Sequence, residues 1–187
     1  MTAILDLPEV RRRVSRLTVD EYHRLDEFNE NGKRTELIRG IVIEKRSKSP
    51  LHATIASQLY KLILPKVPDS FTARTDAPLT LRDSEPEPDI SVVRGADSDF
   101  IQAHPNTASL LIEIAVSSAE LDRELAFLYA EAGVEEYWIV LADKRAVEVF
   151  RRPVEGVYQE KIGIEGSASL ASAAVPGFTV SLKELFG

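Results

Sequence analysis

Apolar residues at alternate positions mark the first predicted strands of this chain. Leu37, Ile41 and Ile43 recur at this spacing on either side of Gly40. Apolar residues two apart point to the same face of a strand, so the spacing predicts a hairpin or a long bent strand pair that turns at Arg39 and Gly40.

Short apolar runs predict the remaining strands. We expect strands at residues 71–74, 79–81, 90–93, 110–116, 135–142, 146–152, 157–162 and 178–180. The last two runs are expected to finish the sheet at its periphery. Residues 95–106 are polar and contain Pro105, which predicts a loop with one helical turn.

Two helix starts lie in the first half of the chain. The sequence TVDE at residues 18–21 is a capping box, in which the threonine hydroxyl and the glutamate carboxylate satisfy backbone amides. This helix is expected to run to about Asn29, where NENG forms a turn. Ser49 and Pro50 begin a second helix, because a serine cap followed by proline suits a helix N-terminus.

A third helix is predicted to begin after Ser117 or Ser118 and to end at Gly133. We expect one side of it to be lined by Leu121, Leu125, Leu128 and Tyr129. Helices and strands therefore mix, and the predicted fold class is α/β (α+β), a central mixed β-sheet flanked by helices. Residues 1–17 are expected to form a flexible arm, and residues 18–187 a single domain.

The composition is that of a folded globule, with 187 residues, 44% hydrophobic and 28% charged. No apolar run is long enough to span a bilayer, and no secretory signal is expected at the N-terminus. The absence of cysteine excludes disulfides, a thiolate zinc site and a cysteine nucleophile. It fits a cytoplasmic location.

A net charge of −7 argues against broad nonspecific attraction to nucleic acid, which depends on neutralising phosphates. Local basic clusters exist nevertheless: Arg11, Arg12, Arg13 and Arg16, and then Lys45, Arg46 and Lys48. We interpret both as a solvated face or a mobile arm in preference to a nucleic-acid footprint.

Two acids adjoin predicted strands and carry the candidate chemistry. Asp89 precedes the run at residues 90–93, and Glu113 lies in the run at residues 110–116. If these strands are neighbours, both acids can face one cleft at the same end of the sheet. Two carboxylates there suit a hard cation such as Mg²⁺ or Mn²⁺. The alternative is that Asp89 only caps its strand and Glu113 is merely exposed.

Several phrases of the sequence, taken in order, resemble a known family. They are LTVDEYHRL, ELIRGIVIE, SPLHATIASQL, SEPEPDISVV, HPNTASLLIEIAVSS and LYAEAGVEEYWIV. Together they resemble the restriction-endonuclease-like superfamily named for its PD-(D/E)XK motif, and within it the Uma2 family of endonucleases. The resemblance covers most of the chain and implies the restriction-endonuclease-like core.

The resemblance implies metal-dependent hydrolysis of DNA. Asp89 and Glu113 match the two acids that hold Mg²⁺ or Mn²⁺, and the carbonyl of Ile114 matches a further ligand. Glu36 matches an acid that completes the site directly or through water. A metal in such a site lowers the pKa of a bound water and neutralises charge on the phosphodiester.

The chain departs from the superfamily at the catalytic lysine. Two residues after the second acid, where that lysine normally stands, this sequence has Ala115. Relatives of the Uma2 kind carry the lysine on the next helix, in a stretch resembling DREKAxxYAEAG. The same stretch of this chain reads DRELAFLYAEAG, with Leu125 at the lysine position. Leucine carries no charge and donates no hydrogen bond.

Other polar residues near the acids have more than one interpretation. His52 either contacts a phosphate or a site water, or bonds nearby backbone in the first helical turn. Lys45 and Lys48 leave the hairpin of Glu36 and could approach the cleft, but we expect them to be solvated. Tyr129 is expected to belong to the core.

Two functions follow as hypotheses. The first is a metal-dependent endonuclease with Asp89 and Glu113 as metal ligands, Glu36 assisting and DNA as substrate. The second is a nuclease-derived domain that no longer cuts and serves as a binding or assembly module. Relatives also suggest a homodimer, which an enzyme cutting both strands would use.

Overall fold

The computed structural model describes residues 7–26, 32–45 and 47–187. The chain divides into two compact units. The first, which we call the hairpin unit, comprises Met1–Lys45 and Arg82–Pro86. The second, which we call the sheet unit, comprises Arg46–Leu81 and Glu87–Gly187.

The hairpin unit begins with two short helices. α1 (Pro8–Arg13) has no buried residue. α2 (Val19–Asp26) starts at the predicted capping box: the Thr18 amide donates to the Glu21 carboxylate at 2.8 Å, and the Glu21 amide donates to the Thr18 hydroxyl at 3.2 Å. The predicted helix start is therefore confirmed, whereas the predicted turn near Asn29 lies outside the described residues.

The predicted hairpin is confirmed as β1 (Thr35–Ile38) paired with β2 (Ile41–Glu44). Its two turn residues, Arg39 and Gly40, have φ of 52° and 75°, the left-handed values that tight hairpin turns require. Glycine is needed at position 40, because a Cβ there would lie 2.6 Å from the Cβ of Arg16.

Residues 82–86 join the hairpin unit through backbone hydrogen bonds. The Gly40 amide donates to the Asp83 carbonyl at 2.8 Å, and the Glu85 amide donates to the Leu37 carbonyl at 2.6 Å. Leu37 is fully buried. This segment of the chain therefore belongs with the hairpin, although it lies more than forty positions further along the sequence.

The sheet unit is built on one mixed sheet with strand order β3-β4-β5-β6-β7-β8. Its strands are β3 (Phe71–Thr75), β4 (Ile90–Arg94), β5 (Leu110–Ala115), β6 (Glu136–Leu141), β7 (Ala146–Val154) and β8 (Val157–Glu165). β5 and β6 are parallel, and the other neighbouring pairs are antiparallel. The predicted fold class, a central mixed sheet flanked by helices, is confirmed.

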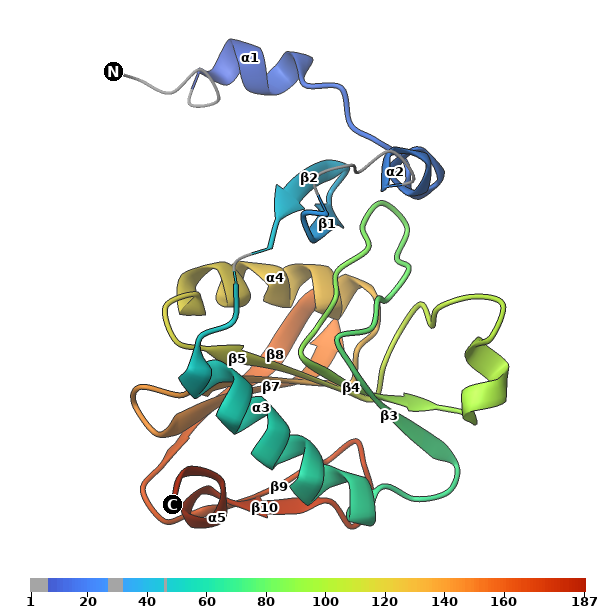
Figure 1. Ribbon diagram of the computed structural model, residues 1–187. Coiled ribbons are helices and arrows are strands. Elements are labelled where there is room, and N and C mark those ends of the chain that lie inside the picture. The colour runs from blue at the N-terminus through green and yellow to red at the C-terminus, as the bar shows by residue number, and fades with distance from the viewer. Residues whose placement is uncertain (1–6, 27–31, 46) are drawn as a thin grey trace. The chain divides into compact units, whose positions relative to one another are not determined.

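Helices cover the sheet on both faces (Figure 1). α3 (Pro50–Ile63) lies against one face together with the C-terminal elements, and α4 (Ala119–Glu131) lies against the other. α3 begins as predicted, with the Ser49 hydroxyl accepting from the His52 amide at 3.2 Å. α4 forms the crossover that a parallel strand pair requires.

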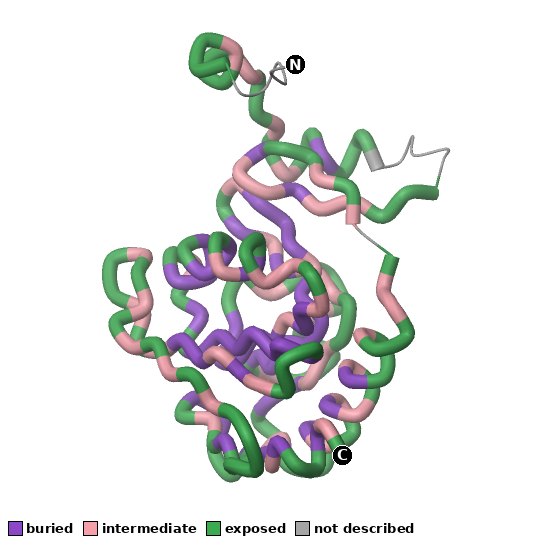
Figure 2. Tube along the Cα trace, turned by 90° about the vertical axis from the view of Figure 1, so that its left-hand side faces the viewer, coloured by how far each residue is buried: buried purple, intermediate pink, exposed green. Residues whose placement is uncertain are grey.

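Burial is greatest along the central strands, as the purple segments of Figure 2 show. Every residue of β6 is buried. Tyr137 and Trp138 point to opposite faces of this strand, and both are fully buried because each face is covered. Trp138 stacks on Phe178 with ring centroids 5.5 Å apart.

Three details differ from the sequence predictions. The run at residues 178–180 does not finish the main sheet, because Thr179–Ser181 pairs with Ser169–Ala171 in a separate two-stranded sheet. Residues 79–81 form no strand: Leu79 and Leu81 are buried in a loop, so their alternation reflects burial and not sheet pairing. Leu121, in the first turn of α4, is 51% exposed, whereas Leu125, Leu128 and Tyr129 further along the helix are buried as expected.

The chain ends in small elements that pack beneath the sheet: β9 (Ser169–Ala171), β10 (Thr179–Ser181) and α5 (Leu182–Phe186). A buried carboxylate connects this region to the sheet. Glu136 accepts hydrogen bonds from Trp138 Nε1, Arg151 Nε, the Ser172 hydroxyl and the amides of Ala173 and Ala174, at 2.7 to 3.1 Å. None of the helices in the described part of the chain is both long and apolar enough to cross a bilayer.

Candidate active site

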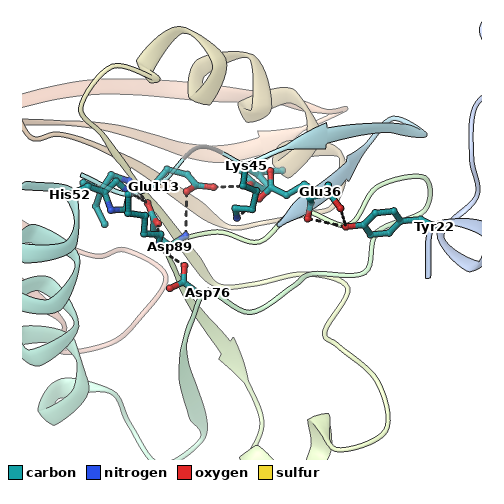
Figure 3. A network of polar contacts seen from close by, with 11 residues as sticks. Tyr22, Glu36, Lys45, His52, Asp76, Asp89 and Glu113 are labelled. Carbon is teal, nitrogen blue, oxygen red and sulfur yellow. Dashed lines mark hydrogen bonds and ion pairs between the residues drawn. The ribbon is translucent and has the colours of Figure 1, made fainter. Parts of the chain in front are cut away.

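The structure brings Asp89 and Glu113 together. Ile90 on β4 pairs with Ile112 on β5, so Asp89 lies just before one partner and Glu113 just after the other. The Asp89 amide donates to Glu113 Oε2 at 3.2 Å (Figure 3). Antiparallel pairing in this register therefore puts both carboxylates at the same end of neighbouring strands.

The Asp89 carboxylate is almost fully surrounded by donors. Oδ2 accepts from the Ile114 amide at 2.8 Å and lies 3.0 Å from His52 Nε2, while Oδ1 accepts from Lys48 Nζ at 2.8 Å. Its side chain is 8% exposed. Burial alone would raise the pKa of Asp89, but the hydrogen bonds from His52 and Lys48 outweigh burial and lower that pKa to about 2. The group is therefore held ionised.

His52 contacts Asp89, a partner that neither sequence interpretation included. The first turn of α3 presents its ring to the carboxylate, and the Ser49 cap fixes that turn. The other ring nitrogen, Nδ1, is buried and has no hydrogen-bond partner among the described residues. His52 is thus a residue that holds Asp89 from the α3 side of the sheet (Figure 3).

Lys48 lies between two carboxylates. Its ammonium contacts Asp89 Oδ1 and also Asp76 Oδ1, and its side chain is 25% exposed. Burial alone would lower the pKa of Lys48, but its hydrogen bonds to Asp76 and Asp89 raise it. The expectation of a solvated Lys48 is wrong, because its ammonium is paired with both carboxylates. Local polarity could not predict these partners, since they lie 28 or more residues away in the sequence.

The second acid is held by a tyrosine. Glu113 Oε1 accepts from the Tyr129 hydroxyl at 3.0 Å, and Tyr129 is fully buried on α4. Tyr129 is therefore a core residue, as predicted, but its hydroxyl also orients Glu113. The sequence signal was a phenol on the buried face of an amphipathic helix, since a buried hydroxyl needs a polar partner.

The two positions that lack the family lysine are apolar and inaccessible. Ala115 is 1% exposed and Leu125 is 8% exposed. The lysine that contacts the Asp89 carboxylate is instead Lys48, in the segment just before α3.

Glu36 lies on β1 in the hairpin unit. Lys45 Nζ lies 2.5 Å from Glu36 Oε1, and the two side chains are 16% and 17% exposed. The expectation that Lys45 is solvated is therefore also wrong. Nearby on the same strand, the Tyr22 hydroxyl donates to the Thr35 carbonyl at 2.9 Å (Figure 3).

The chemistry of the donor set fits a hard divalent cation. Among the described residues, no group of three or more His, Cys, Asp or Glu side chains is arranged as a metal site. Mg²⁺ does not require one, since it is commonly held by one or two carboxylates together with water and substrate phosphate oxygens. Asp89, Glu113 and the Ile114 carbonyl are oxygen donors of that kind.

These features define the protein as an α/β protein with a central mixed sheet covered by helices. An aspartate stands just before one strand of this sheet, and a glutamate lies on the neighbouring strand. Residues 19–183 match the sequence model of the Uma2 family, described as "Putative restriction endonuclease". The chain belongs to this family. None of the curated proteins matches the sequence significantly.

A solved structure supports the same fold. The chain is similar to a crystal structure of "a putative nuclease belonging to DUF820 from Anabaena variabilis ATCC 29413". The TM-score is 0.74 and the sequence identity 25%, over 91% of this chain and 97% of that one. The likeness therefore extends over both chains almost from end to end.

Proposed function

We propose that this protein is a nuclease that hydrolyses DNA phosphodiester bonds with a divalent cation, Mg²⁺ or Mn²⁺, held by Asp89 and Glu113. The observation that carries the proposal is the contact between these acids on adjacent strands, at the Asp89 amide and Glu113 Oε2. Membership of the Uma2 family and the likeness to a nuclease structure support it.

The chain's own residues prepare the two carboxylates. Asp89 is kept ionised by Lys48 and His52, and the Ile114 amide fixes the position of Oδ2. Tyr129 fixes Glu113 in the same way. When bound, the ion supplies a water of lowered pKa and neutralises charge on the scissile phosphate. Side chains held in this way lose little freedom when they become ligands.

Two further residues are assigned roles by the same proposal. Glu36 acts as an accessory acid, a role supported by its position in the family phrase ELIRG. His52 supports the site by holding Asp89, and its imidazole is also the proposed contact to a DNA phosphate.

Metal binding and cleavage test the proposal together. Isothermal titration of Mn²⁺ into the pure protein should show binding that Asp89→Asn and Glu113→Gln both weaken strongly. Plasmid or single-stranded DNA should be cleaved by the wild type with Mg²⁺ or Mn²⁺, and not by either variant. Glu165→Gln, an exposed carboxylate at the end of β8, is the matched control and should behave as wild type. Wild-type protein that neither binds Mn²⁺ nor cleaves DNA would end the proposal.

The rival function is a binding or assembly module that has lost catalysis. The burial of the apolar side chains Ala115 and Leu125 at the two lysine positions favours it. Fold alone does not decide between the two. DNA cleavage by the wild type that disappears in Glu113→Gln would exclude the module, whereas metal-independent DNA binding without cleavage would support it.

A further inference from the structure

Three acids form a row across neighbouring strands of the sheet. Thr75 pairs with Ile90, and Ile90 pairs with Ile112, so the next positions along are Asp76, Asp89 and Glu113. The Asp76 amide donates to the Asp89 carbonyl at 3.3 Å, which extends the pairing by one step. The row carries three negative charges at one end of the sheet (Figure 3).

Lys48 places a positive charge between the first two acids of this row. Its ammonium contacts Oδ1 of both Asp76 and Asp89, so it occupies the place between the first two acids. Asp76 has φ of 49°, a conformation that non-glycine residues adopt rarely, and this conformation accompanies a carboxylate aimed at the ammonium.

The other carboxylate oxygen of Asp89, Oδ2, has no free position for a cation. Oδ2 already accepts from the Ile114 amide and faces His52 Nε2. A divalent ion that uses Asp89 must therefore bind at Oδ1, the atom that Lys48 contacts. If the ammonium and the ion shared that atom, their positive charges would lie close together, and this repulsion favours the departure of the ammonium.

We propose that Lys48 is an internal cation that competes with the divalent ion for Asp89, and that metal binding transfers its ammonium to Asp76 alone. Without metal, Lys48 neutralises the buried Asp89 and keeps it from repelling Glu113. When the ion binds, Asp76 retains the ammonium beside the metal, where it can face an anionic substrate. The inference rests on the proposed metal site. It implies that Lys48 lowers the affinity of this site for the divalent ion.

Calorimetric titration with Mn²⁺ alone tests the exchange. Lys48→Met removes the competitor and should raise the Mn²⁺ affinity roughly tenfold or more, the worth of one charge-assisted hydrogen bond. Lys48→Gln, which retains a neutral donor, should raise it less, and it serves as the second variant if Lys48→Met folds poorly. Lys61→Met on the exposed side of α3 makes the same change in net charge and should leave the affinity near wild type.

A double-mutant cycle separates exchange from simple attraction of the ion by Asp76. In the wild type, Asp76→Asn deprives the displaced ammonium of its second partner and should weaken Mn²⁺ binding. In the Lys48→Met background no ammonium has to move, so the same substitution should have a smaller effect. Equal effects in both backgrounds would mean simple charge additivity and would overturn the exchange.

The outcomes distinguish the inference from the proposed function. Equal Mn²⁺ affinity in wild type and Lys48→Met overturns the inference and leaves the metal site standing. Binding by Lys48→Met but not by wild type supports the inference in its strongest form. Binding by neither protein overturns both. A crystal structure with Mn²⁺ on Asp89 should show Lys48 Nζ on Asp76 only, and an ammonium still on Asp89 Oδ1 would refute the exchange.

Discussion

The hydroxyl of Tyr129 donates a hydrogen bond to Glu113 Oε1 at 3.0 Å, from a side chain with no exposed surface. The bond joins α4 to the proposed metal ligand on β5. It makes the orientation of Glu113 depend on how α4 packs against the sheet.

Replacing Tyr129 by phenylalanine should separate packing from orientation. The ring remains in place, so the free energy of unfolding should fall by only about 1 kcal/mol, the usual worth of one hydrogen bond. Mn²⁺ affinity should fall several-fold, because Glu113 gains freedom that binding must remove. Tyr158→Phe loses a comparable bond, to the Val134 carbonyl, and should leave Mn²⁺ binding unchanged. Equal Mn²⁺ affinity in wild type and Tyr129→Phe would show that this hydrogen bond contributes to stability but not to metal binding.

A lysine at position 125 should destabilise the fold, because the site is buried. Leu125 is 8% exposed, and burying an ammonium there should lower the free energy of unfolding by about 2–3 kcal/mol. The melting temperature should then drop by roughly 4–12 °C. Leu121→Lys is the same substitution on the same helix at a position 51% exposed, and it should change the melting temperature little. Similar melting temperatures for the two variants, with DNA cleavage gained by Leu125→Lys, would show that position 125 borders the site.

Acid should weaken the protein through Asp89. Its pKa is lowered from the ordinary value of 3.8 to about 2, so folding favours the ionised form. The resulting stability is fully present above pH 3.8 and is lost as the pH falls through 3.8 towards 2. Urea unfolding between pH 5 and about pH 2 should therefore show a steeper loss for the wild type than for Asp89→Asn. Parallel curves would show that Asp89 does not contribute.

Removing Glu136 should be the most damaging of these changes. Glu136→Ala leaves Arg151 and Trp138 Nε1 without their buried acceptor, which should cost about 3–5 kcal/mol in urea unfolding. Glu135→Ala, one position earlier, removes a surface pair with Arg94 and the hydrogen bond from the Ser109 hydroxyl, and should cost only about 1–2 kcal/mol. Comparable losses in the two variants would contradict a central role for the buried carboxylate.

Local signals in the sequence were sufficient for much of the fold. The capping box at Thr18, the serine cap at Ser49 and the turn at Gly40 act over a few residues, and each appears where predicted. The run at residues 79–81 failed because burial of Leu79 and Leu81 in a loop produces the same alternation as a strand.

The site was predictable only in part. Asp89 and Glu113 could be paired because each adjoins a strongly apolar strand. The contact between Lys48 and Asp76 could not be predicted, because it depends on the register of β3 against β4 and on where α3 begins. A polar stretch such as residues 45–49 looks solvated until tertiary partners are known.

The parallel pairing of β5 with β6 also constrains the order in which the protein can be assembled. Neighbouring parallel strands cannot close until the whole intervening helix exists, and such long-range closure is slow. On the ribosome, Glu113 emerges well before Tyr129 and before the strand that ends at Leu141. A nascent chain therefore carries both proposed ligands before Tyr129 can hold Glu113 in place, so the proposed metal site is completed only late in folding.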